Sequence, residues 1–207
     1  MNQTGILAAI EVDLDSRVER CSIQSLGSVS GAYVALRAAR GSRVLGNTLA
    51  DMQATAAESF TAIEGQTHMT ISGNEVRGIS GGASSTVFGI VAGRNSSVTQ
   101  NRLAGIRGGI PHGIRLTSTI VGGTSDTGNL SAGNDLLEIV ALATNEGDPG
   151  AGIVSDLPVT IEGNRIDGIS FFDGLSGQVR NPAIRTTPDV VIARNTLHDI
   201  RGNSNHT

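Results

Sequence analysis

The residues best suited to proton transfer are an aspartate and a histidine that hold equivalent places after two asparagines. Asp167 stands three residues after Asn164, and His198 stands three residues after Asn195 and next to Asp199. If these asparagines mark successive turns of a repeat, Asp167 and His198 lie on adjacent turns. A carboxylate that orients an imidazole can act as an acid–base pair. The alternative, which the polar surroundings favour, is an exposed contact between solvated side chains. Asp167, His198 and Asp199 are the catalytic candidates.

Metal and thiol chemistry have little support in the residue spacing. The four histidines are far apart and lack the spacing of a metal-binding motif (His68, His112, His198 and His206). The single cysteine, Cys21, can form neither an intrachain disulfide nor a cysteine zinc site. It is expected to serve as a small buried hydrophobic residue. We therefore expect no metal and no cofactor.

Charge and hydropathy exclude two classes of partner. The formal net charge is −4, and the fifteen basic residues are scattered along the chain, so there is no basic patch for a nucleic-acid backbone. No apolar run approaches the length of a membrane span, and the first residues lack the features of a signal peptide. The expectation is a protein without nucleic-acid or membrane partners. As written it is intracellular, whereas an excerpt of a longer protein could be extracellular or particle-associated.

An internal repeat organises the chain. Six asparagines occupy one recurring position, and Cys21 occupies it in a seventh copy: Asn47, Asn74, Asn101, Asn134, Asn164 and Asn195. Apolar residues recur three before, two after and five after this position, and Ser131 is the one exception among these sites. The loose spacing between copies requires that insertions lie in loops.

The apolar spacing of three could indicate a helix, but the residue types favour strands. The apolar positions are rich in β-branched residues, and glycine precedes the asparagine in four copies (Gly46, Gly73, Gly133 and Gly163). Each glycine inside a helix costs about 1 kcal/mol. A strand, a sharp bend at the asparagine and a second strand explain the pattern better. Asparagine tolerates the left-handed conformation that such a bend needs. Stacked asparagines could hydrogen-bond from turn to turn as a structural ladder.

A third strand in each turn is indicated by segments such as Gly89-Ile90-Val91 and Gly113-Ile114-Arg115-Leu116. The complete pattern resembles the parallel β-helix repeat of the pectin-lyase-like superfamily. We therefore expect an all-β, right-handed, single-stranded parallel β-helix of about seven turns with an asparagine ladder. We expect one domain, residues 1–207, as a whole protein or as a segment of a longer chain, with a polar tail at residues 201–207.

The resemblance allows a check for the active sites of that superfamily. Polygalacturonase-like enzymes contain an Asn-Thr-Asp motif, but Asn47-Thr48 and Asn195-Thr196 are each followed by leucine. Epimerase-like enzymes contain Asp-Pro-His-Glu, whereas Asp148-Pro149 is followed by glycine. The calcium-binding aspartates and arginine of pectate-lyase-like enzymes have no counterpart. The fold alone says little about activity.

Two insertions are candidates for a working surface. Segments 140–150 and 170–182 leave the same corner on adjacent turns and are expected to form one lip. The binding candidates on this lip are Phe171, Phe172, Asp173 and Asp148. A separate column carries charges that alternate from turn to turn, and we interpret it as an exposed salt-bridge ladder (Glu75, Arg102, Asp135 and Arg165).

Two functions remain in competition. The first, which we favour, is a non-catalytic structural or interaction solenoid, such as part of a fibre, spike or surface protein. The second is a polysaccharide lyase, hydrolase or epimerase, or a carbohydrate-binding protein, although only 2% of residues are aromatic. The first and last repeats show no polar cap, so we expect self-association, as a trimer or end to end, or adjoining protein domains. Carbohydrate is a possible further partner.

Overall fold

The computed structural model describes most of the repeat array. The described residues are 7–26, 30–54, 56–117, 128–142, 150–172, 183–186 and 189–203. Every regular element among them is a β-strand. No helix in this part of the chain has the length and hydropathy needed to cross a membrane.

The strands form three parallel sheets of seven strands each. Sheet A contains β1 (Leu7–Val12), β4 (Ser30–Ala38), β7 (Ala56–Gly65), β10 (Thr86–Ala92), β13 (Ile110–Leu116), β16 (Ala151–Ser155) and β19 (Ile184–Thr186). Sheet B contains β2 (Arg17–Glu19), β5 (Arg43–Leu45), β8 (Thr70–Ser72), β11 (Ser97–Thr99), β14 (Asn129–Ala132), β17 (Val159–Glu162) and β20 (Val190–Ala193). Sheet C contains β3 (Ser22–Gln24), β6 (Thr48–Ala54), β9 (Glu75–Gly81), β12 (Arg102–Gly108), β15 (Asp135–Ala141), β18 (Arg165–Phe172) and β21 (Thr196–Asn203).

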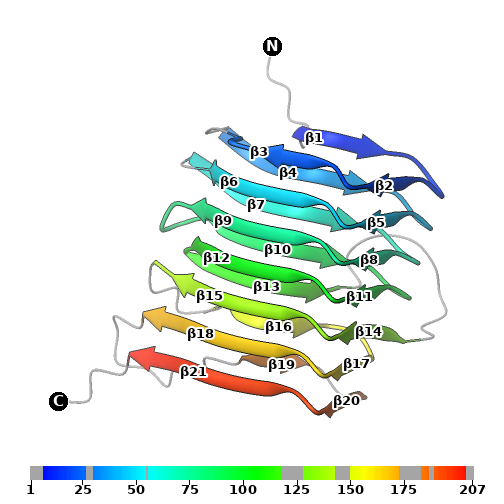
Figure 1. Cartoon of the computed structure of the whole chain (residues 1–207). Coiled ribbons are helices and arrows are strands. Elements are labelled where there is room, and N and C mark those ends of the chain that lie inside the picture. The colour runs from blue at the N-terminus through cyan, green and yellow to red at the C-terminus, as the bar shows by residue number, and fades with distance from the viewer. Residues whose placement is uncertain are drawn as a thin grey trace.

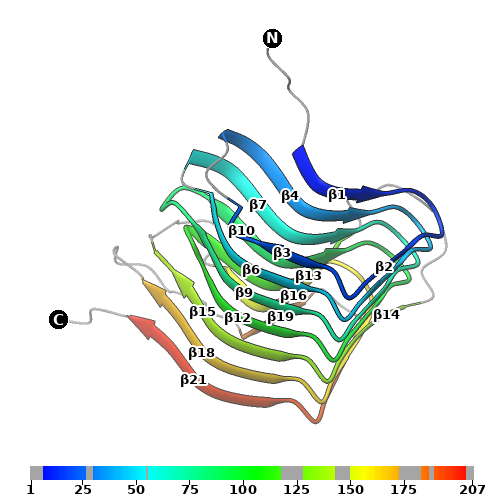
Figure 2. The ribbon, with the colours of Figure 1, turned by 45° about the horizontal axis from the view of Figure 1, so that its top comes forward.

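The chain passes through sheets A, B and C in turn and then begins the next layer. Each strand therefore pairs with the strands three places before and after it in the sequence. Figure 1 shows the layers stacked from β1 at one end to β21 at the other, and Figure 2 shows their common course around the solenoid. The prediction of an all-β parallel β-helix with three strands in each turn is confirmed.

The core is a set of columns that run along the solenoid. The residues two and five after the asparagine are fully buried in the central turns, as Leu103 and Ile106 illustrate. Ser131, the polar exception in the column three residues before the asparagine, is also fully buried. Its backbone carbonyl accepts a hydrogen bond from Asn164 Nδ2 at 2.9 Å. Burial of these columns supplies most of the stabilisation because apolar area leaves water in every turn.

The bend between sheets B and C differs in one detail from the expectation. The left-handed residue is the one before the asparagine and not the asparagine itself. Its φ is between 53° and 66° in Arg20, Gly46, Gly73, Gln100, Gly133, Gly163 and Arg194. Glycine is frequent there because it lacks the Cβ that makes this conformation unfavourable. The asparagine is selected for its side chain.

The side chains of the asparagine column are hydrogen-bonded from turn to turn. Asn74 donates its backbone N–H and its Nδ2 to the Oδ1 of Asn101, at 3.0 and 2.9 Å. Its Nδ2 also donates to the carbonyl of Val44 at 2.9 Å and to the carbonyl of Ser72 at 3.2 Å. The same arrangement recurs from Asn47 to Asn164, and each of these side chains is about 1% exposed. Every buried polar atom of the amide therefore has a partner.

The first turn has a different residue in this column. Cys21 is only half-buried, and its backbone N–H donates to Asn47 Oδ1 at 2.9 Å. The expectation that Cys21 is a buried core residue was too strong, although its side chain packs against the core.

The last turn is exposed where the earlier turns are buried. Ile192 is 54% exposed and Leu197 is 51% exposed, whereas the paired residues of the preceding turn, Ile161 and Ile166, are fully buried. Strand β21 extends to Asn203, so residues 201–203 of the expected polar tail are strand residues, while residues 204–207 lie outside the described residues.

Candidate functional site

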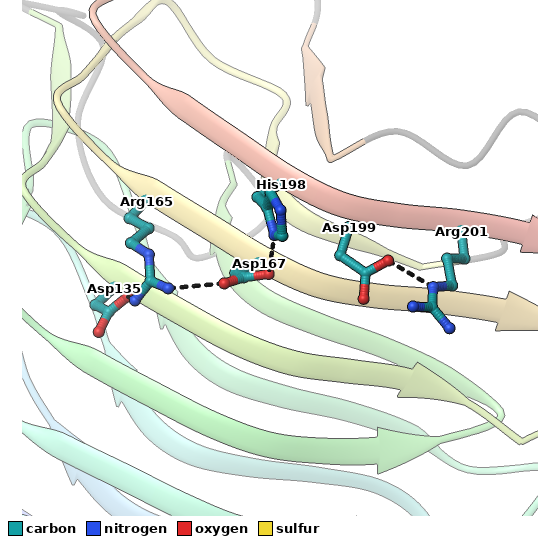
Figure 3. A network of polar contacts seen from close by, with 6 residues as sticks. All are labelled: Asp135, Arg165, Asp167, His198, Asp199 and Arg201. Carbon is teal, nitrogen blue, oxygen red and sulfur yellow. Dashed lines mark hydrogen bonds and ion pairs between the residues drawn. The ribbon is translucent and has the colours of Figure 1, made fainter.

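The acid–base candidates meet on the outer face of sheet C, as expected. Asp167 of β18 pairs in register with His198 of β21, and Asp167 Oδ1 lies 3.0 Å from His198 Nδ1. Arg165 contacts the other carboxylate oxygen of Asp167 at 2.7 Å and also lies 3.4 Å from Asp135. Figure 3 shows Asp167 between Arg165 and His198.

This environment favours the ionised form of Asp167. The hydrogen bond from His198 lowers the pKa of Asp167 most strongly, and the positive charges of His198 and Arg165 lower the pKa further. Partial burial acts in the opposite direction. The pair has the geometry in which a carboxylate orients an imidazole. The side chain of His198 is 75% exposed, so its other ring nitrogen is accessible from solvent.

Asp199, the third catalytic candidate, is directed elsewhere. Its carboxylate forms an ion pair with Arg201, two residues farther along β21. Figure 3 shows this ion pair apart from the contact between Asp167 and His198. The structure therefore brings two of the three candidates together and gives Asp199 a separate partner.

The alternating charges also align as expected. Glu75, Arg102, Asp135 and Arg165 are consecutive register partners on sheet C. The ion pair between Asp135 and Arg165 connects adjacent turns, whereas Glu75 lies 3.8 Å from Arg77 of its own strand. Exposed pairs of this kind contribute about 0–1 kcal/mol each.

A shallow hollow of about 420 Å³ lies elsewhere on the outer face of sheet C. Its floor contains Gly78 and Gly105, which are adjacent in one column and both have a left-handed backbone. Asp51 and Glu138 continue this column on either side, also with positive φ. The remaining lining includes two cationic side chains and a hydroxyl: Arg77, Arg107 and Ser80. The hollow exists because two successive turns lack a side chain at this position.

Sheet A carries a cluster that the sequence reasoning missed. His112 stacks on Phe88 with ring centroids 5.0 Å apart and is 1% exposed. The guanidinium of Arg115 lies over the same Phe88 ring, 5.6 Å from its centroid, and forms an ion pair with Asp156 at 3.4 Å. Phe88 and His112 each precede the glycine of a Gly-Ile pair. Alignment of those pairs would have placed the two rings on adjacent turns.

The expected binding lip is only partly described. Segments 140–150 and 170–182 begin within neighbouring strands of sheet C, as β15 and β18 show. Phe171 and Phe172 are strand residues of β18 paired with Gly202 and Asn203 of β21, so they are not loop residues. Asp148 and Asp173 lie outside the described residues.

Neither a metal centre nor a relative identifies a chemistry for these sites. Within the described ranges, no three His, Cys, Asp or Glu side chains are grouped so that they could hold a metal ion. Comparison with protein-family models, curated proteins and solved structures finds no match to this chain. Function has to be argued from the side chains themselves.

Proposed function

We propose that this chain is a non-catalytic structural or interaction β-helix of the pectin-lyase-like kind, part of a fibre, spike or surface protein. Its role is to supply a rigid solenoid that joins other protein at the end formed by β19, β20 and β21, here called the C-terminal end. The exposure of Ile192 and Leu197 carries this proposal, because the same two columns are fully buried one turn earlier. Exposed apolar surface next to free strand edges favours association.

The state of the catalytic candidates supports a surface role. Asp167 is engaged by Arg165 and His198, and Asp199 is engaged by Arg201. An ion network on an exposed sheet face stabilises register and solubility without any reaction. In this interpretation, the contact between Asp167 and His198 is one of the ion pairs of that network.

Association through the C-terminal end is tested by light scattering and sedimentation over a range of concentrations. We expect weak self-association that increases with concentration and is abolished by Leu197→Asp. Leu14→Asp is the matched control, because Leu14 is 63% exposed but lies in the first turn. Equal association of the two variants would contradict contact through this end.

The absence of catalysis is tested with polyuronates and common glycans, with and without calcium. We expect no release of unsaturated or reducing sugars. Release that disappears in Asp167→Asn and in His198→Ala would overturn the structural role and assign the reaction to this pair.

Carbohydrate binding without catalysis is the second candidate, and the hollow over Gly78 and Gly105 favours it. Guanidinium, carboxylate and hydroxyl groups line this hollow and can form hydrogen bonds with sugar hydroxyls. Binding of a glycan that is lost in Arg107→Gln but retained in Arg43→Gln, an exposed arginine of sheet B, would support this candidate. Identical binding by both variants would contradict it.

A further inference from the structure

The C-terminal end differs from the other turns in its hydrogen bonding as well as in its exposure. In each pair of turns from Asn47 to Asn195, the Oδ1 of the later asparagine accepts two hydrogen bonds. One comes from the backbone N–H of the earlier asparagine and one from its Nδ2, as in the pair Asn164 and Asn195 at 2.9 Å each. The chain of amides therefore has a direction, with donors facing the C-terminal end.

Asn195 is the last asparagine of this hydrogen-bonded series among the described residues. Its Nδ2 donates one hydrogen bond back to the carbonyl of Ile161 at 2.8 Å. Its second Nδ2 hydrogen and its backbone N–H face the position where a further turn would place an acceptor, and no described residue supplies one. Two donors aimed at one point require an oxygen with two free lone pairs.

We propose that the C-terminal end is a docking surface for a parallel β-helical coil that carries a side-chain amide or carboxylate oxygen at its corner. The corner is the bend that corresponds to the one between sheets B and C, where the asparagines lie. This inference rests on the proposed function, in which the same end contacts protein. Such a coil would pair with the free edges of β19, β20 and β21. It would cover Ile192 and Leu197 with its own apolar residues and place its corner oxygen one strand spacing from Asn195.

The need for an acceptor opposite Asn195 favours this occupant over a second copy of the described end turns. Head-to-tail stacking would present Cys21, whose sulfur is only a weak acceptor, to the donors of Asn195. Val18 and Ile23 of that first turn are already 5% and 8% exposed, so they offer little apolar surface. In tail-to-tail stacking the opposing Asn195 Oδ1 already accepts two hydrogen bonds from its own Asn164. Apolar contact alone allows weak association between copies but leaves the amide donors unpaired.

A coil of the protein's own sequence is a suitable probe. Residues 82–108 contain β10, β11 and β12 with the corner residue Asn101. Gly81 and Gly202 hold the same register position in sheet C, so a copy of residues 82–108 joined directly after Gly202 continues the solenoid in register. The baseline is the chain that ends at Gly202.

Three versions of the appended coil separate the effect of the oxygen at its corner from the effect of covering Ile192 and Leu197 with apolar residues. They carry, at the position of Asn101 in the copy, asparagine, aspartate as Asn101→Asp, or alanine as Asn101→Ala. Hydrogen exchange of the backbone amides of β20, β21 and Asn195, which lies between these strands, is measured for each version together with the thermal midpoint. With asparagine we expect exchange at Asn195 to slow by at least about tenfold and the midpoint to rise. Aspartate should retain most of this protection because its oxygens accept both donors.

The coil with alanine should slow exchange at Ile192 and Leu197 because it covers them. The backbone amide of Asn195 should still exchange nearly as fast as in the chain that ends at Gly202. Equal protection of Asn195 by the asparagine and alanine coils would overturn the role of the corner oxygen. No protection by any of the three coils would show that this end does not accept a coil. These outcomes are independent of the scattering and glycan assays, which use the unextended chain, so a failure here is distinguishable from a failure of the proposed function.

Discussion

Asn101 Nδ2 donates to Oδ1 of Asn134 at 3.0 Å, although the two residues are 33 positions apart in the chain. The contact forms because the strands on both sides of this bend stay in register with the next turn, β11 with β14 and β12 with β15. The asparagine side chains therefore hydrogen-bond across the bend between sheets B and C even where the spacing of the repeat is irregular.

Replacement of Asn101 by alanine should destabilise the protein by about 2–3 kcal/mol. The substitution leaves the backbone N–H and Nδ2 of Asn74 buried without an acceptor, and each unsatisfied donor costs about 1–3 kcal/mol before relaxation. Urea unfolding measures the effect. The neighbouring exposed Arg102→Gln is the control, with an expected change within about 0.5 kcal/mol. Similar unfolding midpoints for the two variants would show that the buried amide contributes little.

Ile106→Ala should cost about 2–5 kcal/mol, because Ile106 is fully buried and the neighbouring turns cannot collapse into the cavity. Ile200→Ala removes the same atoms from the end of the same column, where the side chain is only partly buried. Its cost should be clearly smaller. Denaturant melts compare the two, and equal losses would contradict the difference in burial.

The left-handed corner position predicts opposite effects for two substitutions. Gly46→Ala places a Cβ at φ 58° with no atom within 4 Å, so its cost is conformational, about 1 kcal/mol. Gln100→Gly at φ 55° removes the same strain, and we expect a gain of a few tenths of a kcal/mol after the entropy of glycine is subtracted. Thermal unfolding tests the signs. A stabilising Gly46→Ala would show that the corner has a different conformation in solution.

The contact between Asp167 and His198 predicts a specific acid titration. Because the folded state lowers the pKa of Asp167, this contact stabilises the protein above the ordinary pKa of aspartate. The stabilisation is lost as the pH falls through the lowered pKa of the folded state. NMR titration of the Asp167 carboxyl should show this pKa return toward its ordinary value in His198→Gln. The conservative control Thr196→Ser, two residues before His198 on β21, should leave the lowered pKa of Asp167 in place. An unchanged Asp167 titration in His198→Gln would contradict the contact.

The periodic part of the fold was predictable from residue types alone. The apolar columns around Leu103 and Ile106 and the recurrence of Asn101 define an inward face and a corner, so strand order and register followed from the repeat. The meeting of Asp167 with His198 followed from the same register. Each of these inferences needs only that equivalent positions stack, which parallel pairing imposes.

Details within a turn depended on the folded backbone. Asparagine and glycine both tolerate positive φ, so composition alone could not show that Gly73 takes this conformation and Asn74 supplies the hydrogen bonds. The ends of strands were also misjudged. Phe171 and Phe172 remain paired with β21 because an adjacent strand offers their backbone a partner, which a turn-by-turn comparison of residue types does not reveal.

By itself, the sequence determined that the chain stacks as a parallel β-helix, because a period of apolar and asparagine positions can be buried and paired in only this way. The tertiary structure decided which polar groups meet across turns that differ in length. It directs Asp199 to Arg201 and places His112 against Phe88. It also leaves Ile192 and Leu197 exposed at the C-terminal end, where no described residue accepts from the Asn195 backbone N–H. Those outcomes depend on side-chain direction and on whether a neighbouring turn is present, and both are properties of the assembled solenoid.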